Sequence, residues 1–259
     1  MKVEVLVATM HQTDRELLKR LNLQTDAVVI NQCDRTAYEE IDYEGHRVIW
    51  VDTCQRGLSK SRNMALSYAS GNICIFADED IIYPDGYGEM VKKAFEDQPR
   101  ADIMAFNTEC LNLKGTMKRI PIEKPRKAPR NKYYGSVRLA FRRNKLVKAG
   151  IFFHTLIGAG TKYGAGEESL LLRQCRKAGM KIYENPACLA TVDYTTSTWF
   201  SGYDAVYYHN KGVFLALAYG KLARFYGMYF VLQGMRISEL SPKVIYGHIL
   251  AGIKEYYEL

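Results

Sequence analysis

The sequence has no closely spaced pair of cysteines, no long apolar run and no common glycine-rich nucleotide-binding loop. Its six scattered cysteines form no Cys-x-x-Cys pair, which favours buried free thiols in a reducing compartment over a disulfide framework or a zinc site. No stretch reaches the roughly 18 apolar residues of a membrane-spanning helix, and the opening MKVEVLVATM is too short and too acidic for a signal peptide. The absence of a GxGxxG or Walker motif argues against a Rossmann dehydrogenase and a P-loop enzyme. We therefore expect a cytoplasmic protein outside those two enzyme classes.

The sequence does contain ample apolar material and one strongly basic segment. Its 259 residues, 47% hydrophobic and 25% charged, suit one large α/β domain, alone or with a C-terminal extension. Residues 114–132 hold eight Lys and Arg against one Glu, which is most of the net charge of +8. Prolines exclude a regular helix there, so we expect a loop that is either simply solvated or attracts phosphate on a nucleotide, a lipid diphosphate or an anionic membrane. Because no aromatic residues are interleaved with the charges, nucleic acid is not an expected partner.

Apolar strands alternate with helices through the first half of the chain. The pattern predicts strands at residues 3–9, 27–31, 47–51, 73–77 and 101–107, helices at 59–69 and 88–96, and a short helix that ends near residue 21 after a capping box of Thr13 and Glu16. This β-α rhythm with continuous apolar strands predicts an α/β fold, with a mainly parallel sheet covered by helices on both faces. Ligands bind such sheets at the carboxyl ends of the strands.

The second half of the chain is less regular. We expect a strand at 135–142, a short helix at 145–149, a glycine-rich loop at 157–166, a helix at 169–178 and a strand within 181–192. Beyond residue 199 the sequence becomes helical, apolar and rich in tyrosine. Residues 213–232 fit either a helix packed on the main domain or a helix lying on a membrane surface. The predicted organisation is a main domain at 1–199 and a helical C-terminal extension at 200–259.

An acidic motif follows the expected strand at 73–77. Asp78, Glu79 and Asp80 come directly after this apolar run. Alternate side chains of an extended backbone share a face, so Asp78 and Asp80 can point to one spot, where their like charges repel. A divalent cation such as Mg2+ or Mn2+ would relieve that repulsion and would share hard oxygen ligands with a substrate phosphate. The alternative is an acidic turn that only ends the strand.

A second acidic pair, Glu167 and Glu168, lies where the glycine-rich loop enters a helix. A carboxylate at a helix N-terminus gains from the helix dipole and the free backbone amides, which keeps it ionised. Such a group is a suitable general base for a hydroxyl nucleophile. The alternative is that both acids serve stability alone, as acidic residues in a first helical turn commonly do.

In their order and spacing, these motifs resemble those of the GT-A glycosyltransferases of family 2. The resemblance covers about residues 1–195 and begins with the strand at 3–9 and with Asp34 after the second strand. GLSKSRNMAL at 57–66 is similar to the family's Gly-x-x-x-x-Arg-Asn helix beside the nucleotide. FADED at 76–80 resembles the Asp-x-Asp metal motif, and GAGEE at 164–168, before a helix with Arg173, resembles the motif of the acceptor-activating acid.

The resemblance implies roles for individual residues. The residues that would contact the donor nucleotide are Thr9, Asp34, Arg62, Asn63 and Asp78. Asp34 would contact the base, with uracil favoured, and Asp80 together with Asp78 would hold Mn2+ or Mg2+ against the diphosphate.

Three further details come from comparison with the family pattern. Many relatives carry a late histidine that helps to hold metal or diphosphate; here the nearest candidates are Asp193 and, further on, His209. Asp193 is the candidate substitute ligand, unless it is an ordinary surface acid. The second strand ends in Asn-Gln-Cys-Asp at 31–34 instead of paired acids. Glu168 takes the aspartate-like second position of its pair and is favoured over Glu167 as the base that deprotonates the acceptor hydroxyl. Direct attack would invert the anomeric centre.

The sequence thus predicts a metal-dependent inverting glycosyltransferase. It would move a sugar from a nucleotide-diphosphate donor, a UDP-sugar being favoured, to a saccharide or lipid-linked saccharide acceptor. Such chemistry suits polysaccharide assembly in the cytoplasm, with peripheral contact at the inner face of the cell membrane. One alternative is a nucleotidyltransferase, which would carry a glycine-rich basic loop after the first strand, where MHQTDREL stands. The other is a non-catalytic membrane-associated scaffold, which would show no metal-dependent nucleotide binding.

Overall fold

The computed structural model describes residues 1–111, 121–193, 195 and 202–259. Its strands are β1 (Val3–Met10), β2 (Asp26–Gln32), β3 (Ala37–Tyr43), β4 (His46–Thr53), β5 (Ile73–Asp78), β6 (Ile81–Ile82), β7 (Ile103–Leu111), β8 (Arg126–Lys127), β9 (Leu139–Arg142) and β10 (Ile182–Asp193). They form one sheet in the order β3-β4-β2-β1-β5-β9-β7-β10-β6, with β8 paired to β10. The central strands β4, β2, β1 and β5 run parallel, as do β7 and β10, whereas β9 is antiparallel between them.

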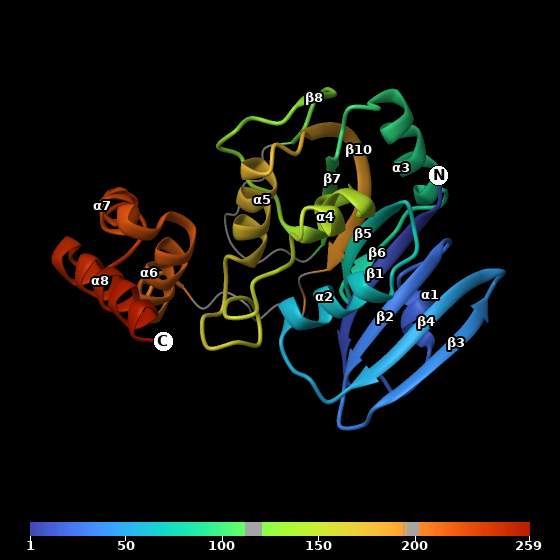
Figure 1. The fold of residues 1–259 in the computed structure, drawn as a ribbon, viewed down its shortest axis with the longest axis horizontal. Coiled ribbons are helices and arrows are strands. Elements are labelled where there is room, and N and C mark those ends of the chain that lie inside the picture. The colour runs from blue at the N-terminus through green and yellow to red at the C-terminus, as the bar shows by residue number, and fades with distance from the viewer. Residues whose placement is uncertain (112–120, 194, 196–201) are drawn as a thin grey trace.

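Helices cover both faces of the sheet, as the sequence predicts (Figure 1). They are α1 (Glu16–Arg20), α2 (Leu58–Tyr68), α3 (Tyr87–Asp97), α4 (Arg143–Lys148) and α5 (Glu167–Lys177), with a 3-10 turn at Ser136–Arg138 where a strand was expected. One apolar core joins α1 and α3 to the sheet through Leu17 and Val91. The core on the other face joins α2, α4 and α5 through residues such as Leu66, Leu146 and Leu172. Side chains from one face of the sheet are buried in the first core and those from the other face in the second. This arrangement confirms the α/β prediction.

Strand β3 was not predicted. Its sequence, AYEEIDY, is mostly exposed and pairs antiparallel with β4 at the edge of the sheet. The hairpin turn places Glu44 and Gly45 at φ 52° and 82°, the left-handed conformation that tight turns between strands require. An edge strand with two solvated faces carries no apolar pattern, so apolar runs cannot reveal it.

The predicted capping box of Thr13 and Glu16 is wrong. Helix α1 begins at Glu16 with Arg15 at its N-cap and without a side-chain cap. The carboxylate of Asp14 instead accepts the Glu16 backbone N–H, at 3.0 Å. Aspartate accepts such a bond as readily as threonine, and the sequence offers both.

Part of the basic segment is anchored to the sheet. Glu184 of β10 is fully buried and accepts hydrogen bonds from Arg126 Nε at 2.5 Å, Lys132 Nζ at 2.6 Å and the Tyr134 hydroxyl at 2.7 Å. Burial opposes its ionisation, but these donors outweigh burial and lower the pKa of Glu184 to about 2. Two cations of the expected phosphate-attracting loop are therefore structural, and residues 112–120 lie outside the described part of the chain.

Three helices follow at the C-terminal end: α6 (Ala205–Tyr219), α7 (Ala223–Gly234) and α8 (Pro242–Glu258). Helices α6 and α8 cross where a Cβ on Gly212 would lie 2.2 Å from the Ile249 carbonyl oxygen and one on Gly252 2.0 Å from that of His209. Only glycine permits this approach. The helical extension is confirmed, whereas its predicted boundary at residue 199 stays a prediction. No helix in the described residues has the length and hydropathy to cross a membrane.

Candidate active site

Both acidic motifs meet at one guanidinium. Arg62 projects from α2, and its side chain is only 1% exposed. Its Nη2 donates to both carboxylate oxygens of Asp78, at 2.9 and 3.1 Å, and its Nη1 donates to Glu168 Oε1 at 3.2 Å. Glu167 Oε1 lies 3.7 Å from the same Nη1. Burial lowers the pKa of Arg62, but the three carboxylates outweigh burial and raise it further. The arginine is thus a fixed positive charge between the strand end of β5 and the first turn of α5.

The two glutamates of α5 differ in exposure. Glu167 is 5% exposed and lies against Gly158, where an added Cβ would be 3.2 Å from its carboxyl carbon. Burial, and then the charge of Glu168, raise the pKa of Glu167 to about 7. The Glu168 side chain is 24% exposed, and its Oε1 also accepts the Ser136 hydroxyl at 3.2 Å. Glu168 is therefore the acid of this pair that is more open to solvent.

The raised pKa of Glu167 predicts a pH-dependent stability. A carboxyl that binds its proton more tightly when folded stabilises the fold below its ordinary pKa of 4.5, and this contribution is lost as the pH rises to about 7. We expect the melting temperature of the wild type to fall by about 5 °C more than that of Glu167→Gln between pH 5 and 8. Thermal melts followed by circular dichroism measure this difference. Parallel curves for the two proteins would contradict the assignment.

Asp80 carries a buried polar atom that can bind a ligand. Its Oδ1 is buried and has no hydrogen-bond partner among the described residues. Burial, and next the charge of Asp78, raise the pKa of Asp80 to about 6. Asp193 lies beside it, because the backbone N–H of Asp193 donates to the Asp80 carbonyl at 2.8 Å where β6 pairs with β10.

A divalent cation fits this acidic corner, although the described residues hold no ready-made cage of three or more His, Cys, Asp or Glu. Magnesium sites in nucleotide enzymes use one or two carboxylates, with water and substrate phosphates completing the shell. Asp80, with its unpartnered buried oxygen, fits the part of a carboxylate ligand in such a shell. Because Asp78 bonds Arg62, Asp80 would be the principal protein ligand of a bound cation.

The remaining predicted nucleotide contacts have varied surroundings. Asp34 is highly exposed and is paired with Arg56. The Thr9 hydroxyl donates to Glu79, the middle residue of the acidic motif, which ties the end of β1 to that motif. Asn63 faces away from the carboxylates: its amide bonds both the N–H and the carbonyl of Phe153, at 2.8 and 2.9 Å. Asn63 therefore positions a loop, and a direct nucleotide contact remains only a prediction.

Several further polar groups, to which sequence reasoning gave no individual role, lie at the same edge of the sheet. Asp52, at the end of β4, is 2% exposed and accepts from Asn31 Nδ2 at 2.7 Å and from Arg35 Nε at 2.6 Å. Gln32 Oε1 accepts the Gly57 N–H at 2.7 Å and so fixes the start of α2. The available signal was the run of amides and carboxylates at successive strand ends. These polar groups lie at the same edge of the sheet as Asp78 and Asp80.

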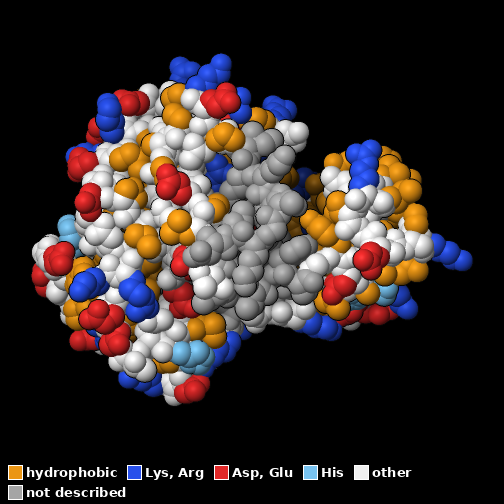
Figure 2. Space-filling model, turned by 180° about the vertical axis from the view of Figure 1, so that it is seen from behind, with side chains coloured by type: hydrophobic (Ala, Val, Ile, Leu, Met, Phe, Trp, Pro, Cys, Tyr) orange, Lys and Arg blue, Asp and Glu red, His pale blue; other side chains and the backbone are white. Residues whose placement is uncertain are grey.

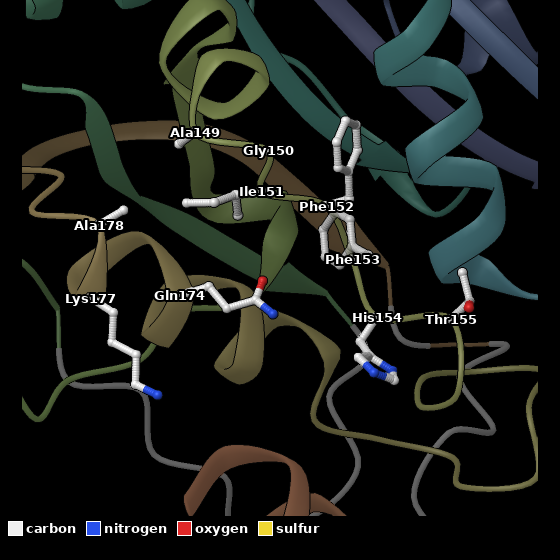
Figure 3. Close-up of a pocket in the computed structure, with 10 residues that line it drawn as sticks. All are labelled: Ala149, Gly150, Ile151, Phe152, Phe153, His154, Thr155, Gln174, Lys177 and Ala178. Atoms are coloured by element: carbon white, nitrogen blue, oxygen red, sulfur yellow. The ribbon is translucent and has the colours of Figure 1, made fainter.

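A surface cavity of about 550 Å³ lies between residues 149–155 and helix α5 (Figure 3). Phe152, His154, Gln174 and Lys177 are among the side chains that line it. Phe153 also lines the cavity, and its ring centre is 5.3 Å from the Arg62 guanidinium carbon. Phe153 therefore lies between the cavity and Arg62, which holds the carboxylate cluster of Asp78, Glu167 and Glu168.

The glycine-rich loop before α5 is held by the C-terminal helices. Gly166 adopts φ 113°, and a Cβ there would lie 2.8 Å from the Phe214 ring of α6. Glu255 of α8 accepts from Lys162 and from the Tyr163 hydroxyl. Arg173 of α5 donates to the Ala218 carbonyl at 2.7 Å. Contacts from α6 and α8 thus surround the segment that presents Glu167 and Glu168.

Comparison with protein families gives a match to the model described as "Glycosyl transferase family 2" over residues 11–155. The match covers more than half of the chain, including Arg62, Asp78 and Asp80. The chain belongs to glycosyl transferase family 2. Its identification as a glycosyltransferase confirms the enzyme class that the motifs predict and leaves the nucleotidyltransferase and scaffold alternatives without support. A search of curated proteins found no match to this glycosyltransferase.

Solved structures of TarS from S. aureus share the fold of this glycosyltransferase. TarS 1-349 in complex with UDP-GlcNAc has a TM-score of 0.62 at 15% identity, covering 100% of this chain and 73% of that one. TarS 1-349 in complex with UDP has a TM-score of 0.60 at 15% identity, covering 92% and 73%. A longer TarS structure has a TM-score of 0.63 at 14% identity, covering 93% and 44%. The predicted GT-A fold is confirmed.

Proposed function

We propose that this glycosyltransferase transfers a sugar from a UDP-sugar to a hydroxyl of a saccharide or lipid-linked saccharide, with inversion and with a divalent cation. The observation that carries the proposal is the convergence of Asp78 and Glu168 on Arg62. It brings a phosphate-side acid and an acceptor-side acid into one site. The family membership supports transfer from a nucleotide sugar, and the TarS complexes with UDP-GlcNAc and UDP support uridine as the nucleoside.

Glu168 acts as the base in this proposal. Arg62 and Ser136 hold its Oε1, which leaves the other carboxylate oxygen to accept the proton of the acceptor hydroxyl. The acceptor oxygen forms its bond to the anomeric carbon as the bond from that carbon to the diphosphate oxygen breaks on the opposite face. Such a single displacement inverts the anomeric centre. Glu167 is too buried for this role and instead packs beneath the loop.

The leaving diphosphate needs positive charge. Asp80, Asp78 and Asp193 would hold Mn2+ or Mg2+, which when bound neutralises the negative charge that develops on the leaving group. Asp80 supports this assignment because its buried Oδ1 lacks a partner among the described side chains.

Asp34 and Arg56 form an exposed ion pair that complements uracil. The uracil ring offers an N3–H donor and an O4 acceptor on one edge, which match a carboxylate and a guanidinium. Guanine offers a similar donor and acceptor, so the preference for UDP over GDP is supported by the TarS complexes with UDP-GlcNAc and UDP. A cytoplasmic location at the inner face of the membrane stays a prediction.

Calorimetric titration of UDP, with GDP as comparison, tests the proposed donor and cation. We expect UDP to bind with Mn2+ and to lose measurable affinity in EDTA. Asp80→Ala should weaken UDP binding by about 10- to 100-fold because a cation ligand is lost. Asp97→Ala, which removes an exposed carboxylate on α3, is the matched control and should bind as the wild type does.

The outcomes of this titration separate the parts of the proposal. Equal affinity for UDP in Mn2+ and in EDTA would contradict the role of the cation but would not contradict sugar transfer from UDP. Tighter binding of GDP would overturn the uridine assignment. Absence of binding by either nucleotide in every condition would contradict the donor proposal as a whole.

A further inference from the structure

Helix α7 and its flanking turns expose a stripe of large apolar side chains. The stripe consists of Leu222, Phe225, Met228, Tyr229, Leu232 and Met235. Each is more than half exposed, from 53% for Met228 to 68% for Phe225. Their spacing of three and four residues places them on one face of the helix. Figure 2 shows hydrophobic side chains gathered on the lobe formed by the C-terminal helices.

The opposite face of α7 is built from small residues. Ala223, Gly227 and Gly234 are its buried positions. A Cβ on Gly227 would lie 3.0 Å from Ile249 of α8, and one on Gly234 would lie 2.6 Å from the Tyr208 hydroxyl of α6. A surface helix of a globular protein normally buries its large apolar residues and exposes its polar ones. Helix α7 packs Tyr226, Phe230 and Val231 partly buried against the core but leaves the stripe exposed, so the stripe residues are not needed for the core that the helix joins.

Positive charge borders the stripe. Residues 221–243 contain Lys221, Arg224, Arg236 and Lys243, all exposed, against the single acid Glu239. Apolar side chains bordered by lysine and arginine are the composition of helices that lie in the interface of an anionic bilayer. A second copy of the chain would bring two such positive borders together, and their repulsion opposes that arrangement.

We propose that the α7 stripe docks on the surface of an anionic lipid bilayer. The helix lies parallel to the membrane, with Phe225 and Leu232 inserted among the acyl chains and Lys221 and Arg224 near the headgroup phosphates. None of the described helices can cross a bilayer, so the contact is peripheral. This inference does not rest on the sugar, the acceptor or the cation, because none of the stripe residues belongs to the carboxylate cluster.

Co-sedimentation of the full chain with vesicles tests the inference. We expect binding to phosphatidylcholine vesicles that contain phosphatidylglycerol, and at least about tenfold weaker partitioning onto phosphatidylcholine alone. The double variant Phe225→Ser/Leu232→Ser should lower partitioning onto the anionic vesicles by about 100-fold, since two exposed side chains lose their burial in lipid. Lys221→Gln/Arg224→Gln should lower it by about tenfold and should flatten its dependence on salt.

Control variants distinguish lipid docking from misfolding and from self-association. Val147→Ser, which alters an apolar residue 41% exposed on α4, should partition as the wild type does. Far-ultraviolet circular dichroism and UDP binding should be unchanged in every variant. Wild-type partitioning by the Phe225→Ser/Leu232→Ser protein would overturn the proposal. So would a dimer in analytical ultracentrifugation that this variant dissociates, because the stripe would then bind a second copy.

Discussion

Replacing Glu168 by Gln is expected to lower kcat by about 10²- to 10⁴-fold while the affinity for UDP stays within about twofold. Glutamine keeps the size of the side chain and can still bond Arg62 and Ser136 through its carbonyl oxygen, but it cannot take a proton from the acceptor. Initial-rate measurements with saturating donor and acceptor give kcat, and calorimetry gives the affinity for UDP. The effect should persist across the pH range in which the wild type is active.

Glu167→Gln is the matched control for this substitution. It removes the same charge from the neighbouring position of the same helix, but at a side chain that is 5% exposed. We expect its kcat to fall by less than about tenfold. The reverse result, with Glu167→Gln inactive and Glu168→Gln active, would move the base to Glu167 and would require the buried carboxyl to become accessible.

Arg62→Met should have the largest effect on stability, lowering the free energy of unfolding by about 3–5 kcal/mol. Methionine fills much of the volume of the arginine stem, but it leaves Asp78, Glu167 and Glu168 facing one another without a positive charge. Urea unfolding followed by circular dichroism measures the loss. A change below about 1 kcal/mol would show that solvent already screens the three carboxylates.

Two further variants separate charge from geometry at this position. Arg62→Lys keeps the charge but cannot make a forked contact to Asp78 and reach Glu168 at the same time, so it should recover only part of the stability. Adding Glu167→Gln to Arg62→Met removes the most buried of the three charges. This second change should restore stability relative to Arg62→Met alone, since glutamine removes the cost of burying this carboxyl, whether it stays ionised or takes up a proton on folding.

The sequence predicted most of the central sheet because its buried strands are continuous apolar runs. Strand β5 and the acids that follow it lie where the pattern placed them. Strand β3 lacked such a pattern because neither of its faces is fully buried. Before helix α1, the sequence offers two side chains, Thr13 and Asp14, that can accept a backbone N–H equally well, so the pattern could not show which one does. Local patterns therefore performed well wherever burial dominated the choice of residue.

The links between the motifs could not be predicted. Arg62 and Glu168 are 106 positions apart, and nothing in either motif shows that one arginine bonds both acidic groups. Asn63, adjacent to Arg62, points instead to the backbone of Phe153. Two neighbours on one helix turn face different partners, and the path of the later chain decides which partner each one meets.

The contacts from α6 and α8 to the glycine-rich loop limit where a chimera of two related enzymes can be joined. A chimera that takes residues 1–199 from this enzyme and its tail from a relative would separate Tyr163 from Glu255 and Gly166 from Phe214. The loop and the terminal helices therefore form one structural unit, and a chimera between relatives should exchange both together.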